Sequence, residues 1–211
     1  LKINNNFERI GIFGGSFDPV HFGHLKPIYE VQKKHNLDQI FYVPLSKPNS
    51  DKNIVASPQQ RIKMLELSLL DNTHQVDSRE IERDGISYTY DTIKSFRDDY
   101  KENSLYLIMG TDNLKSLHRW YKFEELLTLC SIIVISRRIQ KNNLTDPSLQ
   151  RFITHNPSVF HSVSCGKILI EKTLNIEISS SEVRDKLRDK KPVNHLVHPD
   201  LEKWLISNNI Y

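Results

Sequence analysis

Short apolar runs alternate with amphipathic segments along most of the chain. The runs predict strands at residues 10–13, 40–43, 105–109 and 131–135, short strands at 167–170 and 174–178, and a weaker candidate at 74–77. Apolar residues at helical spacing predict helices at residues 23–35, 58–70, 90–100, 120–129, 180–189 and 200–207. Continuous apolar strands between helices are typical of a parallel sheet covered on both faces. We therefore expect an α/β fold with a doubly wound, mostly parallel sheet.

The pattern predicts one domain over residues 1–211, with its core at about 8–137 and 166–189. Residues 138–165 are polar and rich in Asn and Ser, which indicates a long loop or an insertion. Residues 190–211 form a small C-terminal helical segment in this interpretation. At the helix of residues 58–70, Ser57 is the expected N-cap and Pro58 the first helical residue.

Composition excludes several classes of protein. The 211 residues are 38% hydrophobic and 26% charged, which is ordinary for a soluble globular domain. The net charge of +3 comes without a Lys/Arg-rich stripe, so we expect no nucleic-acid partner. There is no apolar run long enough to span a membrane. The first ten residues lack the apolar core of a secretory signal.

The two cysteines, Cys130 and Cys165, form no CxxC pair and have no zinc spacing. Cys130 lies in an apolar run and is expected to be a buried thiol. Free thiols are typical of a reducing compartment, so we expect the protein in the cytoplasm.

Residues 14–24 (GGSFDPVHFGH) directly follow the first predicted strand and precede a helical pattern. A strand, a glycine pair and a helix start present backbone N–H groups to a phosphate. His21 and His24 lie three positions apart in the same turn. The combination predicts a nucleotide site that stabilises negative charge. In the alternative interpretation, the glycines form only a tight turn and the histidines are ordinary core or surface residues.

A second stretch with phosphate-binding chemistry is residues 178–184 (ISSSEVR), at the start of a predicted helix. Serine hydroxyls beside the free backbone N–H groups and partial positive charge of a helix N-terminus favour phosphate. Arg184 follows Ser180 by four positions and therefore lies on the same helix face. Alternatively, Ser179 and Glu182 form a capping box that needs no ligand.

The tetrad at residues 21–24 (HFGH), after GGSFDP, resembles the signature of the nucleotidyltransferase α/β phosphodiesterase superfamily. Its members have a Rossmann-like fold and transfer a nucleotidyl group from a nucleoside triphosphate. In this superfamily an ISSxxxR-type motif lies across from the H-x-G-H turn and binds the triphosphate. Residues 178–184 match that motif.

Two more stretches resemble the bacterial nicotinate-nucleotide adenylyltransferase family. Residues 87–92 (SYTYDT) are similar to its SYTxDT segment, and residues 110–112 (GTD) with 120–121 (WY) to its GxD...W segment. The resemblance runs from about residue 10 to residue 211 and is broken mainly over residues 138–165. It implies transfer of the adenylyl group of ATP to nicotinate mononucleotide, giving deamido-NAD and pyrophosphate in NAD biosynthesis.

The resemblance also implies roles for residues on the ATP side. His21, His24 and Arg184 are the implied catalytic residues, and His24 is the stronger candidate for stabilising the transition state. The other implied ATP-binding residues are Gly14, Gly15, Ser16, Phe17, Gly110, Asp112, Ser180 and Ser181. Mg²⁺ is expected to bridge ATP oxygens and to be held mainly by phosphate and water, without a dedicated protein metal cage.

On the acceptor side, Trp120 and Tyr121 are implied to stack on the pyridine ring, and Thr89 to help bind its carboxylate. The alternative is that both aromatic residues only pack against the protein. Asp91 is interpreted as a helix cap or as a charge in the first helical turn.

The segment after the second predicted strand departs from the family. Where the family commonly has a Pro-Pro-His-Lys type of segment, an ungapped match puts Ser50 and Asp51 at the His-Lys places. Lys47 or Lys52 would then supply the charge beside the substrate phosphate, and Lys47 is our candidate. Arg137 or Arg138 either reaches a phosphate or forms a solvated pair at a strand end.

Two alternatives to the implied function remain open. In one, the same reaction prefers nicotinamide mononucleotide, because a carboxylate and an amide differ in only a few contacts. In the other, the chain is a nucleotide-binding sensor without catalysis. The expected partners are small-molecule substrates rather than nucleic acid or membrane, and the pattern says nothing of the oligomeric state.

Overall fold

The computed structural model describes residues 9–46, 54–69, 71–83, 85–136 and 146–211. In this part of the chain, seven strands form one sheet in the order β3-β2-β1-β4-β5-β7-β6. The strands are β1 (Arg9–Gly15), β2 (Gln39–Pro44), β3 (His74–Val76), β4 (Ser104–Gly110), β5 (Ser131–Ser136), β6 (Ile153–Thr154) and β7 (Ile168–Lys172). The pairs β1–β4, β4–β5, β5–β7 and β6–β7 are parallel.

The strand order reverses beside β1, since β2 and β3 continue on one side of it and β4 and β5 on the other. Such a reversal defines a doubly wound sheet, so the predicted fold class is confirmed. The helices are α1 (Phe22–His35), α2 (Pro58–Glu66), α3 (Arg79–Glu82), α4 (Thr89–Asp99), α5 (Thr111–Leu114), α6 (Phe123–Leu129), α7 (Pro157–His161), α8 (Ser180–Arg188) and α9 (Pro199–Ser207). Two 3₁₀ turns, η1 (Leu117–Arg119) and η2 (Pro147–Phe152), complete the elements.

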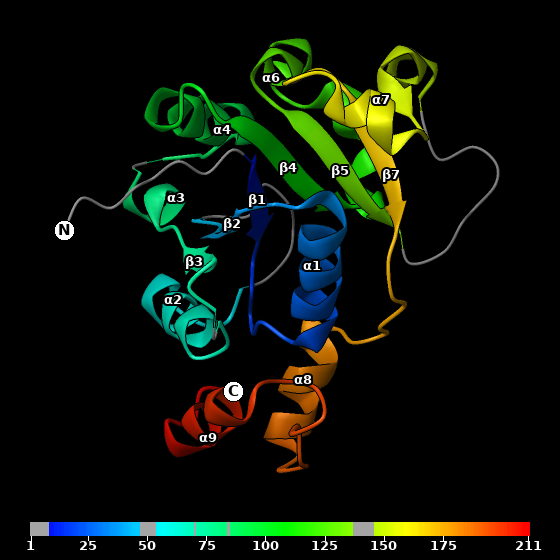
Figure 1. Cartoon of the computed structure of the whole chain (residues 1–211). Helices are drawn as coiled ribbons and strands as arrows, with labels where there is room; N and C mark the ends of the chain where they lie inside the picture. The colour runs from blue at the N-terminus through cyan, green and yellow to red at the C-terminus, as the bar shows by residue number, and fades with distance from the viewer. Residues whose placement is uncertain (1–8, 47–53, 70, 84, 137–145) are drawn as a thin grey trace. The chain divides into compact units, whose positions relative to one another are not determined.

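The chain divides into two compact units, and the expectation of one domain stays a prediction. The first unit comprises Leu1–Phe13, Val31–Ile40 and Tyr88–Thr173. Every residue of β5 is buried in it, as its continuous apolar run predicted. Helices α4 and α6 pack against each other in this unit (Figure 1). Cys130 is fully buried, as predicted, and burial raises the pKa of its thiol to about 12.

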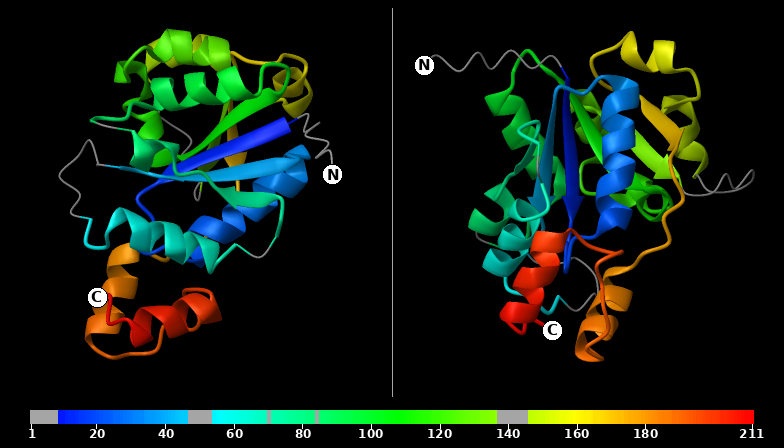
Figure 2. Two further views of the ribbon diagram at one scale, coloured as in Figure 1. Left: turned by 90° about the vertical axis from the view of Figure 1, so that its left-hand side faces the viewer. Right: turned by 60° about the horizontal axis from the view of Figure 1, so that its bottom comes forward.

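The second unit comprises Gly14–Glu30, Phe41–Ser87 and Leu174–Tyr211. The capping box of α2 is complete, because Ser57 accepts from the Gln60 N–H and the Gln60 side chain accepts from the Ser57 N–H. Figure 2 shows α8 (orange) followed by α9 (red), and α9 lies within residues 190–211, the segment predicted to be helical. Both helices contribute buried apolar residues, among them Val183, Leu201 and Leu205.

Two predicted segments need correction. The helix predicted at residues 120–129 begins only at Phe123, because Lys122 has the left-handed φ of 51° that a helix cannot pass through. Residues 174–178 form no strand, since the Leu174 N–H donates to the Glu30 carboxylate and the exposed Leu174 side chain finds no core.

Residues 138–165 were predicted as a loop or an insertion, and this interpretation stays a prediction. The described part of this segment contains η2, β6 and α7. Its Asp and Asn residues are helix caps, because Asp146 accepts from the Ser148 N–H and Asn156 caps α7. The buried Phe160 then anchors α7 in the first unit.

Candidate active site

The turn between β1 and α1 belongs to the second unit, and one buried side chain shapes it. Phe17 is fully buried and has a φ of 50°, in the left-handed region. A Cβ on Gly15 would lie 2.8 Å from the Phe17 ring, so only glycine fits at that position. Gly14 is exposed, and a Cβ there would meet only the Val43 carbonyl oxygen at 3.9 Å. Phe17 therefore shapes the turn from its buried side.

His21 and His24 lie side by side in this turn. Their ring centroids are 3.8 Å apart and their planes differ by 33°. Phe17 meets the His24 ring edge-on at 5.4 Å. His21 is buried, whereas His24 is half-buried and keeps part of its surface available to a ligand.

Gly23, the glycine of the H-x-G-H tetrad, is required by close packing. A Cβ at this position would lie 2.9 Å from Nδ1 of His21 and 3.2 Å from the carbonyl oxygen of Ile178. Ile178 opens the second phosphate-binding motif that the sequence identified. The two motifs are therefore in direct contact within the second unit.

The start of α8 is fastened to the β1–α1 turn by two hydrogen bonds. The Ser180 hydroxyl donates to the Pro19 carbonyl oxygen at 3.0 Å, and Nη1 of Arg184 donates to the Asp18 carbonyl oxygen at 2.6 Å. Nη2 of Arg184 donates to the Ser181 hydroxyl at 3.2 Å. Nε of Arg184 is buried and has no hydrogen-bond partner among the described residues. An unsatisfied buried donor in this position favours an anionic ligand.

Three residues beside this turn were missed by the sequence analysis: Asp18, Arg61 and Tyr211. Asp18 and Arg61 are 2% and 1% exposed. Arg61 donates to the carbonyl oxygens of Ser16 at 2.9 Å and Leu45 at 2.6 Å, and so ties the turn to the end of β2. Burial lowers the pKa of Arg61, and the Asp18 carboxylate opposes that shift. The Tyr211 hydroxyl donates to Asp18 at 2.8 Å.

The remaining candidate residues that the structure describes belong to the first unit. Gly110 ends β4 and is the N-cap of α5, and a Cβ on it would meet nothing within 4 Å. Asp112 lies exposed in the first turn of α5. Thr89 is the first residue of α4, and Asp91 lies in its first turn, as one of its two interpretations expected.

Tyr121 belongs to an aromatic cluster that the sequence did not reveal. Its ring lies 4.6 Å from Tyr88 and meets Tyr90 edge-on at 6.0 Å. Nζ of Lys122 lies 4.8 Å from the Tyr90 centroid and 5.5 Å from that of Tyr121, which gives cation–π contacts to both rings. Tyr88 and Tyr121 are both exposed, so the cluster offers aromatic faces to a ligand.

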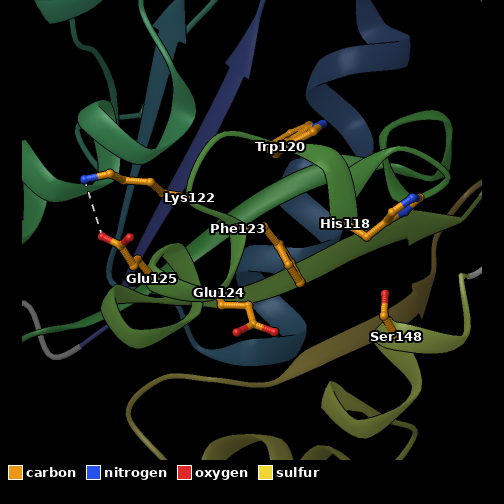
Figure 3. Close-up of a pocket in the computed structure, with 7 residues that line it drawn as sticks. All are labelled: His118, Trp120, Lys122, Phe123, Glu124, Glu125 and Ser148. Atoms are coloured by element: carbon orange, nitrogen blue, oxygen red, sulfur yellow. Dashed lines mark ion pairs between the residues drawn. The ribbon is translucent and has the colours of Figure 1, made fainter.

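Trp120 has different surroundings from Tyr121. It lines a pocket of about 500 Å³ in the first unit, with Phe123 beside it (Figure 3). Lys122 and Glu125 form an ion pair of 3.5 Å at one side of this pocket. The lining residues are His118, Trp120, Lys122, Phe123, Glu124, Glu125 and Ser148. The structure therefore places the two predicted ring-stacking residues in separate environments.

Some candidate residues fall in segments that the structure does not describe. Lys47, Ser50, Asp51, Lys52, Arg137 and Arg138 lie outside the described residues. The described residues contain no group of three or more His, Cys, Asp or Glu side chains that could hold a metal ion. Among them, no helix is both long and apolar enough to cross a membrane.

Comparison with known proteins gives consistent matches. Residues 12–186 match the cytidylyltransferase-like family. A protein of Pectobacterium atrosepticum named "probable nicotinate-nucleotide adenylyltransferase" is 32% identical over 205 residues, covering 94% of this chain and 96% of that protein. A protein of Legionella pneumophila with the same name is 34% identical over 197 residues, covering 91% and 93%.

A solved structure of Plasmodium falciparum nicotinic acid mononucleotide adenylyltransferase, complexed with NaAD, has the same fold. It has a TM-score of 0.69 at 22% identity, with 97% of each chain covered. The chain belongs to the cytidylyltransferase-like family and, within it, to the nicotinate-nucleotide adenylyltransferases. The family inferred from the motifs is thereby confirmed.

Proposed function

We propose that this chain transfers the adenylyl group of ATP to nicotinate mononucleotide, which yields nicotinate adenine dinucleotide and pyrophosphate. The observation that carries the proposal is the attachment of α8 to the turn that bears His21 and His24. Ser180 reaches the Pro19 carbonyl across 161 positions of sequence, so two phosphate-binding motifs share one neighbourhood. The curated relatives, at 32% and 34% identity, support the same reaction by their names.

The reaction is a displacement at phosphorus. A phosphate oxygen of the mononucleotide attacks the α-phosphorus of ATP, and the bond to the bridging oxygen breaks as pyrophosphate leaves. No covalent enzyme intermediate is needed, so catalysis rests on positioning and on neutralising charge. We assign His21 and His24 to the phosphates, with His24 stabilising the transition state. Ser180, Ser181 and Arg184 hold the distal phosphates in this proposal, and backbone N–H groups of residues 14–17 add further contacts.

The proposal includes Mg²⁺ on the oxygens of ATP. The Asp18 carboxylate is committed to the backbone N–H groups of Val55 and Ala56 and to the Tyr211 hydroxyl, so it is not available as a metal ligand. The other side chains at the turn are histidines, serines and an arginine, which fit the phosphate of a metal–ATP complex better than a bare cation. The ion would be held by phosphate and water, and would neutralise charge there.

The acceptor side of the proposal rests on the first unit. We assign Trp120 and Tyr121 to the pyridine ring, Thr89 to its carboxylate, and Gly110 and Asp112 to the ribose and adenine of ATP. The exposed ring cluster around Tyr121 supports aromatic recognition. Lys47 is retained as the candidate for the mononucleotide phosphate. Both cysteines are free thiols, which is typical of a reducing compartment, so we place the reaction in the cytoplasm.

The decisive test measures pyrophosphate release from magnesium and ATP with either nicotinate or nicotinamide mononucleotide as acceptor. We expect faster release with the acid. A clear preference for the amide would mean that nicotinamide mononucleotide is the acceptor, while the class of reaction would stay the same. If the chain binds ATP but releases no pyrophosphate with either acceptor, it is a nucleotide sensor rather than an enzyme.

A further inference from the structure

Asp18 is a buried carboxylate in the β1–α1 turn, surrounded by three hydrogen-bond donors and one more distant cation. Oδ1 accepts from the Ala56 N–H at 2.9 Å and from the Tyr211 hydroxyl at 2.8 Å. Oδ2 accepts from the Val55 N–H at 2.8 Å and lies 3.5 Å from Nη1 of Arg184. A carboxylate has about four lone-pair positions, so each contact occupies one of them.

Arg184 is anchored mainly by a neutral group rather than by this carboxylate. Its Nη1 donates to the Asp18 carbonyl oxygen at 2.6 Å, whereas the ion pair to Oδ2 is 3.5 Å long. That separation exceeds the roughly 2.7–2.9 Å of a charge-assisted hydrogen bond. The Nε group has no partner among the described residues. The guanidinium is therefore held in place while much of its donor capacity stays open.

Tyr211 is the neutral donor that completes the Asp18 shell. Its hydroxyl also lies 3.6 Å from Sδ of Met64, inside the apolar part of the second unit. Burial and the Asp18 carboxylate both raise the pKa of Tyr211, so the hydroxyl stays protonated and always donates.

We infer that Tyr211 is a positioning residue for ATP binding: its hydroxyl satisfies Asp18 and thereby keeps the carboxylate from closing onto Arg184. The inference rests on the proposed function. Without the hydroxyl, Oδ1 would keep only the Ala56 N–H as a donor. Asp18 is 2% exposed, so water cannot readily replace the lost donor, and a buried acceptor with an unfilled position is costly. The nearest mobile replacement is the Arg184 guanidinium. A shorter Asp18–Arg184 pair would take the arginine away from the triphosphate.

The test compares Tyr211→Phe with the wild-type chain. Phenylalanine keeps the buried ring and removes only the hydroxyl. We expect the KM for ATP to rise about tenfold, the scale of a lost hydrogen bond to a charged group, with the KM for nicotinate mononucleotide changed less than about twofold.

Tyr42→Phe is the matched control in the same unit. Tyr42 is fully buried, and its hydroxyl lies 3.1 Å from Nδ1 of His74, so the variant loses a buried hydrogen bond without touching Asp18. Both variants are expected to lower the melting temperature, but only Tyr211→Phe is expected to raise the KM for ATP. An equal rise in both would mean that the Tyr211 hydroxyl serves the fold alone, which overturns the inference.

A double variant tests whether Tyr211 acts through the arginine. In an Arg184→Gln background, adding Tyr211→Phe is expected to change ATP affinity by less than about twofold, because the coupled group is already gone. Fully additive losses would overturn the inference.

Calorimetric titration with magnesium and ATP, without acceptor, separates this inference from the proposed function. If the wild-type chain binds ATP but releases no pyrophosphate, the proposed function fails. The ratio of the Kd for ATP of Tyr211→Phe to that of the wild-type chain then still tests the inference about Tyr211. If the wild-type chain binds no ATP, both the proposed function and the inference are overturned.

Discussion

At the scale of single residues, the two histidines of the β1–α1 turn have unequal surroundings. His21 is buried, and its ring lies so close to Gly23 that a Cβ on the glycine would come within 2.9 Å of Nδ1. His24 is half-buried, and the edge of Phe17 orients its ring. A group that stabilises developing charge must be both oriented and accessible to the substrate. His24 meets both conditions, so it is the better choice for contact with the transition state.

We predict that His24→Ala lowers turnover by about 100-fold or more, the usual scale for removing one transition-state donor. The measurement is the rate of pyrophosphate release at saturating substrates. His195→Ala is the control, because His195 is an exposed histidine of the same unit whose side chain contacts the neighbouring Asn194. Turnover of the His24 variant within threefold of the control would remove the role assigned to this residue.

The residues that the sequence analysis missed had weak signals or none. Arg61 lies on the same face of α2 as Met64 and Leu65. A charged residue on an apolar helix face was the only signal in the sequence that Arg61 is buried. Asp18 precedes a proline and looked like an ordinary turn residue. Tyr211 reaches Asp18 across 193 positions, and no local pattern encodes such a contact. Local motifs therefore indicated the candidate ligand-binding residues, whereas the residues that support the turn depend on long-range packing.

At the scale of elements, the glycine of the H-x-G-H tetrad lets the turn and the start of α8 meet. We predict that Gly23→Ala lowers the free energy of unfolding by about 1–3 kcal/mol, because the new methyl would overlap the His21 ring and the Ile178 carbonyl. Gly110→Ala is the control, since a Cβ there meets nothing within 4 Å and the φ of −78° suits any residue. Urea denaturation measures both variants. Equal stability of the two would contradict the close packing at Gly23.

Element types were easier to predict than element ends. The apolar runs located β1, β2, β4 and β5, because strands buried on both faces carry an unbroken signal. The start of α6 was predicted too early, because no sequence pattern indicates the left-handed backbone conformation of Lys122. Helix α7 was missed because Asn156 and Pro157 look like loop residues until they are seen as an N-cap and a first helical residue.

At the scale of the whole molecule, each unit buries histidines in their neutral form. In the first unit, the His35 ring lies 3.1 Å from the Glu171 carboxylate and 3.0 Å from Nε2 of His161. An ionised carboxylate only accepts, so Nε2 of His35 donates to it and Nδ1 accepts from His161. Nδ1 of His161 then accepts from the Tyr106 hydroxyl at 3.3 Å. This directed chain of hydrogen bonds satisfies both rings in their neutral form.

Stability should therefore fall in mild acid. Burial is the main cause that lowers the pKa of His161 and of His74, in the second unit, to about 4. In the unfolded chain both titrate near 6.5, so between about pH 6.5 and 4 the unfolded state binds more protons. The free energy of unfolding, measured by urea titration, is expected to decrease as pH falls from 7 to 5. The variant His74→Asn/His161→Asn should flatten that slope, whereas His195→Asn should not. An unchanged slope in the double variant would contradict neutral burial.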